Sequence, residues 1–353
     1  MEKLLHRVRR FVERGERISP DDCRRLFEVN DLNVLSKLGR IMRERRYGLD
    51  AHFRAIETYR YRGEHPELFI SEAETIAPED TVELLLKIEW GAGDTWEGWR
   101  ERFVAFSSAS IPVTLSLTSS FIARAAEGAN KGIPDLLSEL RDAIPIQISG
   151  RDGLLFNDEW RARHAPDSIS PERWLAMHQR AHEAGIRTDA GMVYHSAWNP
   201  DFYVAHLDMI RSLQQKTEGF LSFTPMEWYD SDARFLTAPT ASTTLKGITI
   251  ARLFLDNIPH IVVSPGMGDP ETSYVALSYG ADTIDRSVRP DDLLIETNPL
   301  TMGTSGELPI LSEAEQGKEK RLDLGMIETR ILEARFRPVP VLSNGEQLQP
   351  IDP

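Results

Sequence analysis

The segment 246–285, KGITIARLFLDNIPHIVVSPGMGDPETSYVALSYGADTID, decides the fold. Closely spaced apolar residues over 248–255 predict a well-buried helix. The Asp-Asn pair at 256–257 ends this helix. The apolar run 259–264 is rich in β-branched residues, which is typical of a parallel strand covered on both faces. A glycine-bearing loop, a second helix over 271–279 and a further strand over 281–284 follow. The order helix, strand, loop, helix, strand predicts a βα repeat.

The same alternation extends through most of the chain on either side of this segment. Strand-like runs recur at about eight places, and most are followed by a helical pattern. The predicted strands are 53–59, 81–90, 113–118, 144–149, 188–194, 220–224, 259–264 and 281–284. Such alternation predicts an α/β fold with a parallel sheet. Eight repeats predict its closure into a (β/α)8 TIM-type barrel.

Three parts of the chain are expected on this basis. Residues 1–46 form a helical N-terminal extension, in which Ser19 is a predicted N-cap and Pro20 the first helical residue. Residues 47–336 form the barrel. Residues 337–353 form a proline-rich tail packed on its surface. No internal repeat or linker divides the barrel.

Composition excludes several classes of protein. The 353 residues carry a formal net charge of −14, which repels phosphate backbones and argues against a nucleic-acid partner. No apolar run approaches the ~20 residues that cross a bilayer, so no membrane partner is expected. The N-terminal segment places charged residues among its apolar positions, unlike a signal peptide, which indicates a cytoplasmic protein. The single cysteine, Cys23, excludes an intrachain disulfide framework.

Ordered sequence matches over the whole chain point to one enzyme family. They include ERWL at 172–175, RSLQ at 211–214, LDNIPHI at 255–261 and ALSYGAD at 276–282. With these residues the chain resembles the radical S-adenosylmethionine enzymes of menaquinone and deazaflavin biosynthesis. That group includes aminofutalosine synthase, cyclic dehypoxanthine futalosine synthase and the tyrosine-using subunit of deazaflavin synthase. The resemblance implies a radical S-adenosylmethionine type of barrel and a place in the futalosine route to menaquinone.

The departures from that family concern its cofactors. The family binds a [4Fe–4S] cluster through CxxxCxxC after the first barrel strand, since three thiolates hold three irons and leave one for S-adenosylmethionine. Here that place is occupied by 58–70, TYRYRGEHPELFI, which contains no cysteine. Two other loops face the cofactor in that family. Here they contain bulkier side chains, in the segment 87–91, KIEWG, and in the turn 194–198, YHSAW. We therefore expect a barrel without cluster or cofactor.

Candidate site residues follow from barrel geometry, because active sites of this fold lie at the carboxyl ends of the strands. The catalytic candidates are His195, since an imidazole titrates near neutral pH, with Glu227 or Glu89 as its partner. The ligand-binding candidates are polar or aromatic residues at the other strand ends. They are Glu57, Tyr59, Trp90, Thr118, Ser149, Arg151, Tyr194, Trp198, Trp228, Ser264, Met267 and Asp282, with Asp285 beside it. This mixture suits a polar organic ligand with flat parts.

Structural interpretations stand beside these functional ones. His195 could equally be a satisfied packing residue, and Glu89 and Glu227 could order their loops. Trp90 could fill the volume that the cofactor vacated. His178 and His182 have the spacing of a zinc pair, but their helix lies outside the barrel and lacks the accompanying glutamate, so no metal site is predicted.

Two functions remain open. The first is a non-radical enzyme that acts on a futalosine-like, other nucleoside-derived or enolpyruvyl compound by acid–base chemistry. The second, which the loss of the cluster ligands favours, is a non-catalytic homologue. It would bind a related small molecule in the barrel mouth, or pair with a radical S-adenosylmethionine paralogue or with itself.

Overall fold

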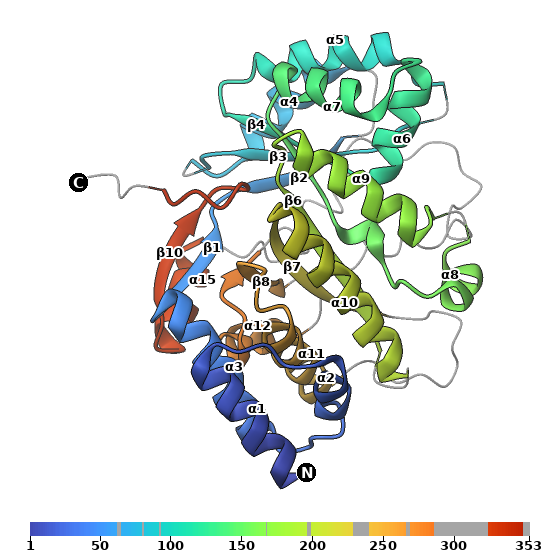
Figure 1. Ribbon diagram of the computed structural model, residues 1–353. Coiled ribbons are helices and arrows are strands. Elements are labelled where there is room, and N and C mark those ends of the chain that lie inside the picture. The colour runs from blue at the N-terminus through green and yellow to red at the C-terminus, as the bar shows by residue number, and fades with distance from the viewer. Residues whose placement is uncertain are drawn as a thin grey trace.

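The computed structural model contains one curled sheet of parallel strands surrounded by helices (Figure 1). It describes residues 1–61, 65–79, 81–91, 93–166, 168–195, 199–228, 240–265, 269–285 and 324–348. The strand order is β10-β1-β9-β8-β7-β6-β5-β4-β3-β2, so β3 to β9 follow one another in space as they do in sequence. That succession is what a series of βα units produces. The predicted α/β class and parallel sheet are therefore confirmed.

Within residues 47–336 the strands lie where apolar runs predict them, with one exception. Their bounds are β1 Asp50–Arg54, β2 Glu57–Tyr61, β3 Leu84–Ile88, β4 Val113–Leu117, β5 Ile146–Ile148, β6 Thr188–Tyr194, β7 Phe220–Glu227, β8 His260–Val263, β9 Thr283–Ile284 and β10 Arg337–Val341. The exception is the single strand expected over 53–59, which is divided between β1 and β2.

The division of this strand reflects a change of neighbour. β1 pairs with β9 and β10, whereas β2 pairs with β3 at the other end of the strand order. Only Ala55 and Ile56 separate the two strands. The sheet therefore curls until its first and last parts are joined by this short bend, which brings side chains from distant strands into one interior.

Helices cover the outside of the curled sheet (Figure 1). Their bounds are α1 Glu2–Arg14, α2 Pro20–Leu26, α3 Leu32–Tyr47, α4 Pro66–Ile76, α5 Trp96–Ser107, α6 Ser119–Gly128, α7 Ile133–Ala143, α8 Asp158–His164, α9 Pro171–Glu183, α10 Pro200–Thr217, α11 Ala241–Phe254, α12 Pro270–Ala276 and α15 Leu324–Glu333. Short 3-10 turns, η1 Arg151–Gly153 and η3 Leu277–Tyr279, add to these. The predicted N-cap of α2 is present, because the Ser19 side chain accepts a hydrogen bond from the Asp22 amide. No described helix is both long and apolar enough to cross a bilayer.

The C-terminal segment is more than a surface tail. Residues 337–341 form β10, which runs parallel to β1 on the outer edge of the sheet. Pro338 and Pro340 alternate along it, so the amides missing from these prolines fall on the edge away from β1. The main-chain amide of Arg337, by contrast, faces β1 and donates to the carbonyl of Leu49, the residue just before that strand. An edge strand is the place where a sheet tolerates such prolines.

Candidate functional site

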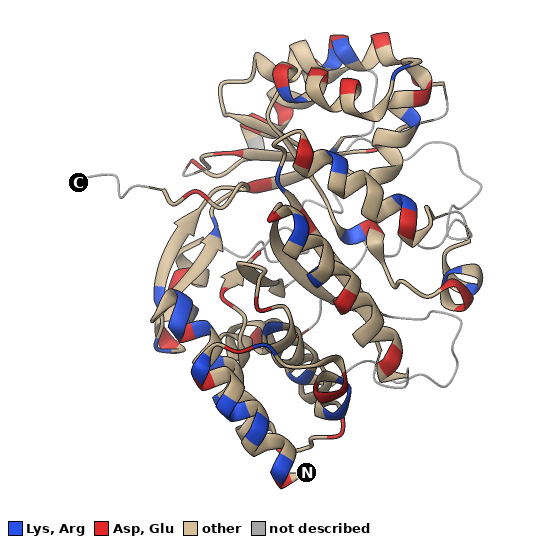
Figure 2. Cartoon of the chain, in the orientation of Figure 1, with Lys and Arg blue, Asp and Glu red and all other residues tan. Residues whose placement is uncertain are grey.

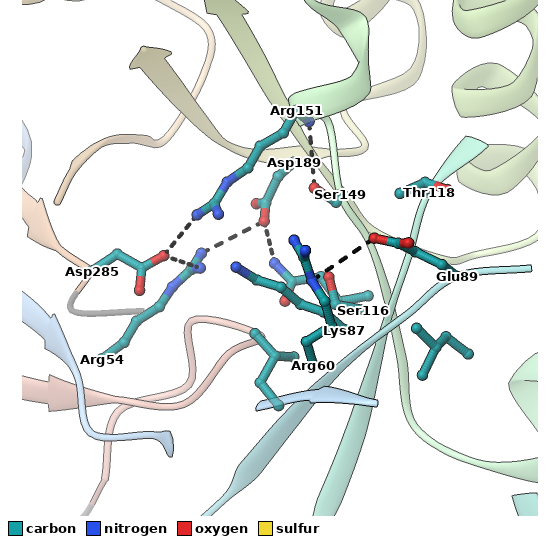
Figure 3. A pocket seen from close by; sticks show the side chains of 13 residues that line it. Arg54, Arg60, Lys87, Glu89, Ser116, Thr118, Ser149, Arg151, Asp189 and Asp285 are labelled. Carbon is teal, nitrogen blue, oxygen red and sulfur yellow. Dashed lines mark hydrogen bonds and ion pairs between the residues drawn. The ribbon is translucent and has the colours of Figure 1, made fainter. Parts of the chain in front are cut away.

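A small polar cavity lies inside the curled sheet, near the carboxyl ends of most of its strands (Figure 3). Its volume is about 30 Å³, which is room for one or two water molecules. Charged and hydroxyl side chains from β1 to β6 and from the segment after β9 line it. They include Arg54, Arg60, Lys87, Glu89, Ser116, Thr118, Ser149, Arg151, Asp189 and Asp285. The interior of the fold is thus polar where ligands bind in barrels.

Asp285 is the centre of the first ion cluster in this cavity. One of its oxygens, Oδ2, accepts from Arg54 Nη1 at 3.1 Å and from Arg151 Nη2 at 3.2 Å. Arg54 ends β1, Arg151 opens η1 after β5, and Asp285 follows β9. Burial by itself lowers the pKa of Arg54, but the carboxylates of Asp285 and Asp189 outweigh it and hold that pKa above its ordinary value.

Asp189 is the second anionic centre, near the start of β6. Its Oδ1 accepts from the Ser222 hydroxyl at 2.6 Å, and its Oδ2 accepts from the Gln147 side-chain amide. Arg54 Nη2 lies 3.6 Å from the same Oδ2. Arg54 is therefore held between two carboxylates, Asp189 and Asp285, and its position is fixed from both sides.

Backbone packing positions Arg151. A Cβ atom on the preceding residue, Gly150, would lie 2.1 Å from the Asp189 carbonyl oxygen, so only glycine allows the turn to approach β6. Asp152, which follows Arg151, is half-buried. Its carboxylate accepts from the Ser119 amide at 2.7 Å and from Trp174 Nε1 at 2.9 Å. Burial raises the pKa of Asp152 despite these hydrogen bonds. The turn that carries Arg151 is thus tied to α6, α9 and β6.

Five of the predicted site residues meet in this cavity. Glu89, Thr118, Ser149, Arg151 and Asp285 all line it. Glu89 faces Arg60, with 3.8 Å between Arg60 Nε and Glu89 Oε1. Thr118 also accepts from the Phe121 amide and so caps α6. Glu89 and Thr118 therefore have ordering roles as well as a place in the site.

Other predicted residues lie away from this cavity. The Tyr59 ring is edge-on to Phe69 of α4, between sheet and helices, and Glu57 is buried on the same strand. Trp90 is edge-on to Phe121, and its indole also lies against Gly128 of α6. These contacts put Tyr59 and Trp90 in the layer under the helices rather than in the interior.

Tyr194 and His195 line a different cavity, which β6 and β7 share with α10 and α11. The backbone amide and carbonyl of His195 both bond the Tyr203 hydroxyl, with 2.6 Å from the amide nitrogen to that oxygen. Since Glu89 lines the inner cavity, the predicted pair of His195 with Glu89 is not brought together there.

Five more predicted residues are buried or lie outside the described part of the chain. Trp228 packs edge-on against Trp160 of α8, and Ser264 is buried after β8. Glu227 ends β7, but its side chain lies outside the described part of the chain. Trp198 and Met267 also lie outside the described residues.

Asp282 was placed at the wrong end of its strand. It precedes β9 and is fully buried at the amino end of the sheet. Its carboxylate accepts from Arg252, from His260 Nδ1 at 2.6 Å and from the Ile261 amide at 2.9 Å. Burial raises the pKa of Asp282, but Arg252 and His260 outweigh this and bring it to about 2. β9 has only two residues, so the mouth is reached by Asp285, three positions later.

Two groups of histidines bring possible metal-ligand atoms close together. His178 Nδ1 and His182 Nε2 both contact the Thr188 hydroxyl, at 2.8 and 2.9 Å, which accounts for their pairing on α9. At the amino end of the sheet, donor atoms of His52, His260 and Asp282 lie within 4.8 Å of one another. Both Asp282 oxygens already accept hydrogen bonds from protein donors. The buried His52 Nδ1 lies 3.9 Å from Asp282 Oδ1 and has no hydrogen-bond partner among the described residues.

Sequence patterns missed more than half of the residues that line the inner cavity. Arg54, Lys87 and Asp189 lie inside predicted strands rather than at their ends, and Arg60 was read as part of the segment after the first one. One signal was available. A charged residue inside an otherwise apolar, fully buried strand needs a partner, which Asp189 in β6 finds in Gln147 and Arg54. Figure 2 shows residues of both charges distributed along the helices around the sheet.

Sequence comparison finds relatives of this chain among the aminodeoxyfutalosine synthases. It is 27% identical over 309 residues to aminodeoxyfutalosine synthase of Thermus thermophilus, covering 78% of this chain and 82% of that one. It is 26% identical to the enzyme of the same name from Streptomyces coelicolor, and this match covers 95% of this chain and 92% of that enzyme. No protein-family profile matches the sequence.

Shorter matches connect two related enzymes. Cyclic dehypoxanthine futalosine synthase of Streptomyces coelicolor is 29% identical over 53% of this chain and 48% of its own. A 5-amino-6-(D-ribitylamino)uracil–L-tyrosine 4-hydroxyphenyl transferase of Methanococcus maripaludis is 27% identical. That match covers 58% of this chain and 56% of the transferase. These enzymes and aminodeoxyfutalosine synthase are homologues of the chain, as the sequence motifs predicted.

Solved structures agree on the fold. Methylornithine synthase, PylB, superposes with a TM-score of 0.64 at 13% identity, covering 94% of this chain and 97% of its own. The hydrogenase maturase HydG from Carboxydothermus hydrogenoformans gives a TM-score of 0.67 at 16% identity. The superposition covers 97% of this chain and 81% of HydG. At these identities the likeness concerns the fold alone.

Proposed function

We propose that this homologue of the aminodeoxyfutalosine synthases is a ligand-binding protein of futalosine-dependent menaquinone biosynthesis that works without an iron–sulfur cluster. Its ligand is an anionic small molecule held at the carboxyl ends of the strands of a (β/α)8 barrel. The observation that carries this proposal is the pair of guanidinium groups, Arg54 and Arg151, that converge on one oxygen of Asp285.

The residues at the expected cluster position do not fit a cluster held by three thiolates. The segment from β2 into α4 contains no cysteine, and Cys23 is the single cysteine of the sequence. Cys23 lies in α2 and is fully buried, and its burial raises the pKa of the thiol. A protonated thiol in the helical extension is a poor iron ligand. Chemistry that depends on the cluster has no basis in these side chains.

The inner cavity supports anion binding in its place. Among the described residues, Asp285 is the one hydrogen-bond acceptor of the Arg151 guanidinium, which has further N–H donors to offer. The Arg151 side chain keeps 16% of its surface exposed, while Asp285 keeps none. A ligand carboxylate can therefore approach Arg151 from the open side and bind it bidentately without displacing Asp285.

The catalytic alternative has weaker support. Its acid–base pair combines His195 with Glu89 or Glu227, yet His195 and Glu89 line different cavities. The inner cavity has room for one or two water molecules, so it supports binding of a ligand's carboxylate group at Arg151 rather than enclosure of a whole futalosine-related ligand. Pairing with a radical S-adenosylmethionine paralogue, or self-association, stays a prediction from the sequence.

A calorimetric titration tests the proposal. Purified protein, assayed for iron after anaerobic reconstitution with iron and sulfide, is titrated with aminodeoxyfutalosine, cyclic dehypoxanthine futalosine and S-adenosylmethionine. We expect micromolar binding of a futalosine compound and no stoichiometric iron. A stable cluster with three or more iron atoms per chain, or binding of S-adenosylmethionine alone, would contradict the proposal.

A further inference from the structure

A second cavity, separate from the inner one, lies between the sheet and the helices. Its volume is about 210 Å³, and its walls come from β6, β7, α10, α11 and the end of α2. Protein interiors are closely packed, and voids larger than a water molecule are few. A cavity of about 150 Å³ is enough to hold benzene. This one has room for a single substituted six-membered ring.

The walls of this cavity are largely apolar and aromatic. Phe27 and Tyr203 lie stacked, with 5.5 Å between ring centroids and 26° between ring planes. Tyr194 and Met192 of β6 add a second apolar surface. The Tyr203 hydroxyl is bound to the backbone of His195, which fixes the orientation of its ring. Rings held in this way offer flat faces to an aromatic ligand.

One cation, Lys246 of α11, stands at the same cavity. Its ammonium donates to the Phe27 carbonyl at 3.1 Å and to the Asn30 side-chain oxygen at 3.2 Å, and both acceptors are neutral. No carboxylate of the described residues forms an ion pair with it. The side chain is half-buried, and burial lowers its pKa. An ammonium in this position retains one N–H donor and an unbalanced charge.

We propose that this cavity binds a single-ring aromatic carboxylate, with its ring among Phe27, Tyr194 and Tyr203 and its carboxylate bound by Lys246. The carboxylate supplies the anionic partner that Lys246 does not find among its described neighbours, and the ring fills the apolar volume. The next residue of α11, Gly247, keeps this volume open. A Cβ atom there would already lie 3.5 Å from Tyr194 Cε2, so any longer side chain would enter the cavity.

This site is independent of the function proposed above, because the two cavities share no lining residue. The probes are benzoate and its neutral isostere benzamide, titrated into the full chain by calorimetry. We expect benzoate to bind at least about tenfold more tightly than benzamide, as a charge-assisted hydrogen bond implies. Equal affinity of the two probes would overturn the assignment, without need of any variant.

Two variants and a control locate the binding. Lys246→Met keeps the length of the side chain and removes its charge, so benzoate affinity should fall about tenfold or more. Lys216→Met, on the exposed face of α10, should leave it unchanged. Gly247→Leu fills the cavity and should abolish binding, while a thermal melt confirms that the variant is folded. In a crystal soaked with 4-bromobenzoate, the bromine signal should lie between α10 and α11. A signal only in the inner cavity, or an unaffected Lys246→Met, would refute the proposal.

Discussion

The guanidinium of Arg252 is bonded to the carboxylate of Asp282 where neither side chain has more than 2% of its surface exposed. Arg252 also donates to the Gly280 carbonyl at 2.8 Å, and Asp282 also accepts from the Ile261 amide. The pair therefore joins α11 to the turn before β9 and to the start of β8. It closes the amino end of the sheet, opposite the inner cavity.

Removal of the arginine of this pair should destabilise the fold strongly. In Arg252→Met the Asp282 carboxylate stays buried without its main cation, and we expect a loss of about 3 kcal/mol or more in the free energy of unfolding. Urea denaturation followed by circular dichroism measures it. The matched control is Arg17→Met, which removes an ion pair with Asp256 whose arginine side chain is 44% exposed. A comparable loss in both variants would contradict a special role for the buried pair.

His206 should make the stability of the protein depend on pH. Its Nδ1 accepts from the Phe156 amide at 3.1 Å, so its proton lies on Nε2, which donates to the Gly191 carbonyl at 3.0 Å. Burial lowers the pKa of His206 to about 3. As the pH falls below about 6.5, the unfolded chain takes up a proton that the folded chain refuses, so stability is lost progressively between pH 6.5 and pH 3.

The comparison of wild type with His206→Gln isolates this effect. The glutamine does not titrate, so its stability deficit at pH 7 should shrink by about 2 kcal/mol when the pH is lowered to 4.5. Chemical denaturation at both pH values measures the deficit. A constant deficit would mean that His206 is protonated as readily in the folded protein as in the unfolded one.

Arg151 should anchor the ligand of the inner cavity. Arg151→Gln removes the bidentate donor, and we expect affinity for a futalosine compound to fall at least about tenfold with little change in melting temperature. Arg173→Gln, on an exposed position of α9, is the control. Affinity for benzoate should not change in Arg151→Gln, since Arg151 does not line the second cavity, the outer one between the sheet and the helices.

Gly150→Ala should disturb both the fold and the inner cavity. The new methyl group would lie 2.1 Å from the Asp189 carbonyl oxygen and 2.4 Å from the Ala190 Cα, neither of which is at the end of a flexible side chain. We expect about 2 kcal/mol of destabilisation together with weaker ligand binding, because the turn that carries Arg151 must move. Gly247→Ala makes only an ordinary contact inside α11 and should be neutral or slightly stabilising. Thermal melts of the two variants measure the difference.

The sequence predicts the elements better than it predicts the site. Apolar runs bounded by Gly, Pro and Asp mark most strands, and the left-handed Gly280, with a φ of 111°, ends the helical segment where expected. The bend at Ala55 and Ile56 was missed because β1 and β2 differ in their distant neighbours, which local pattern does not encode. The same holds for β10, whose prolines read as a loop until β1 is found beside it.

The inward and outward faces of β6 could not be distinguished from sequence. Every residue of β6 is buried, so the alternation of period two that would separate the faces is absent. Asp189 turns to the inner cavity, whereas Met192 and Tyr194 line the outer one. A prediction based on strand ends alone therefore joined Tyr194 and His195 to residues on the other side of the sheet.

The position of β1 has a consequence for biosynthesis. Both of its edges are paired with strands made much later, β9 at 283–284 and β10 at 337–341. At ribosomal speeds of roughly 5–20 residues per second, β1 waits on the order of ten seconds or more for these partners, with Ala51 and Phe53 not yet covered. The nascent chain must therefore carry an unpaired apolar strand through most of its own synthesis, and it should depend on chaperones that hold such segments.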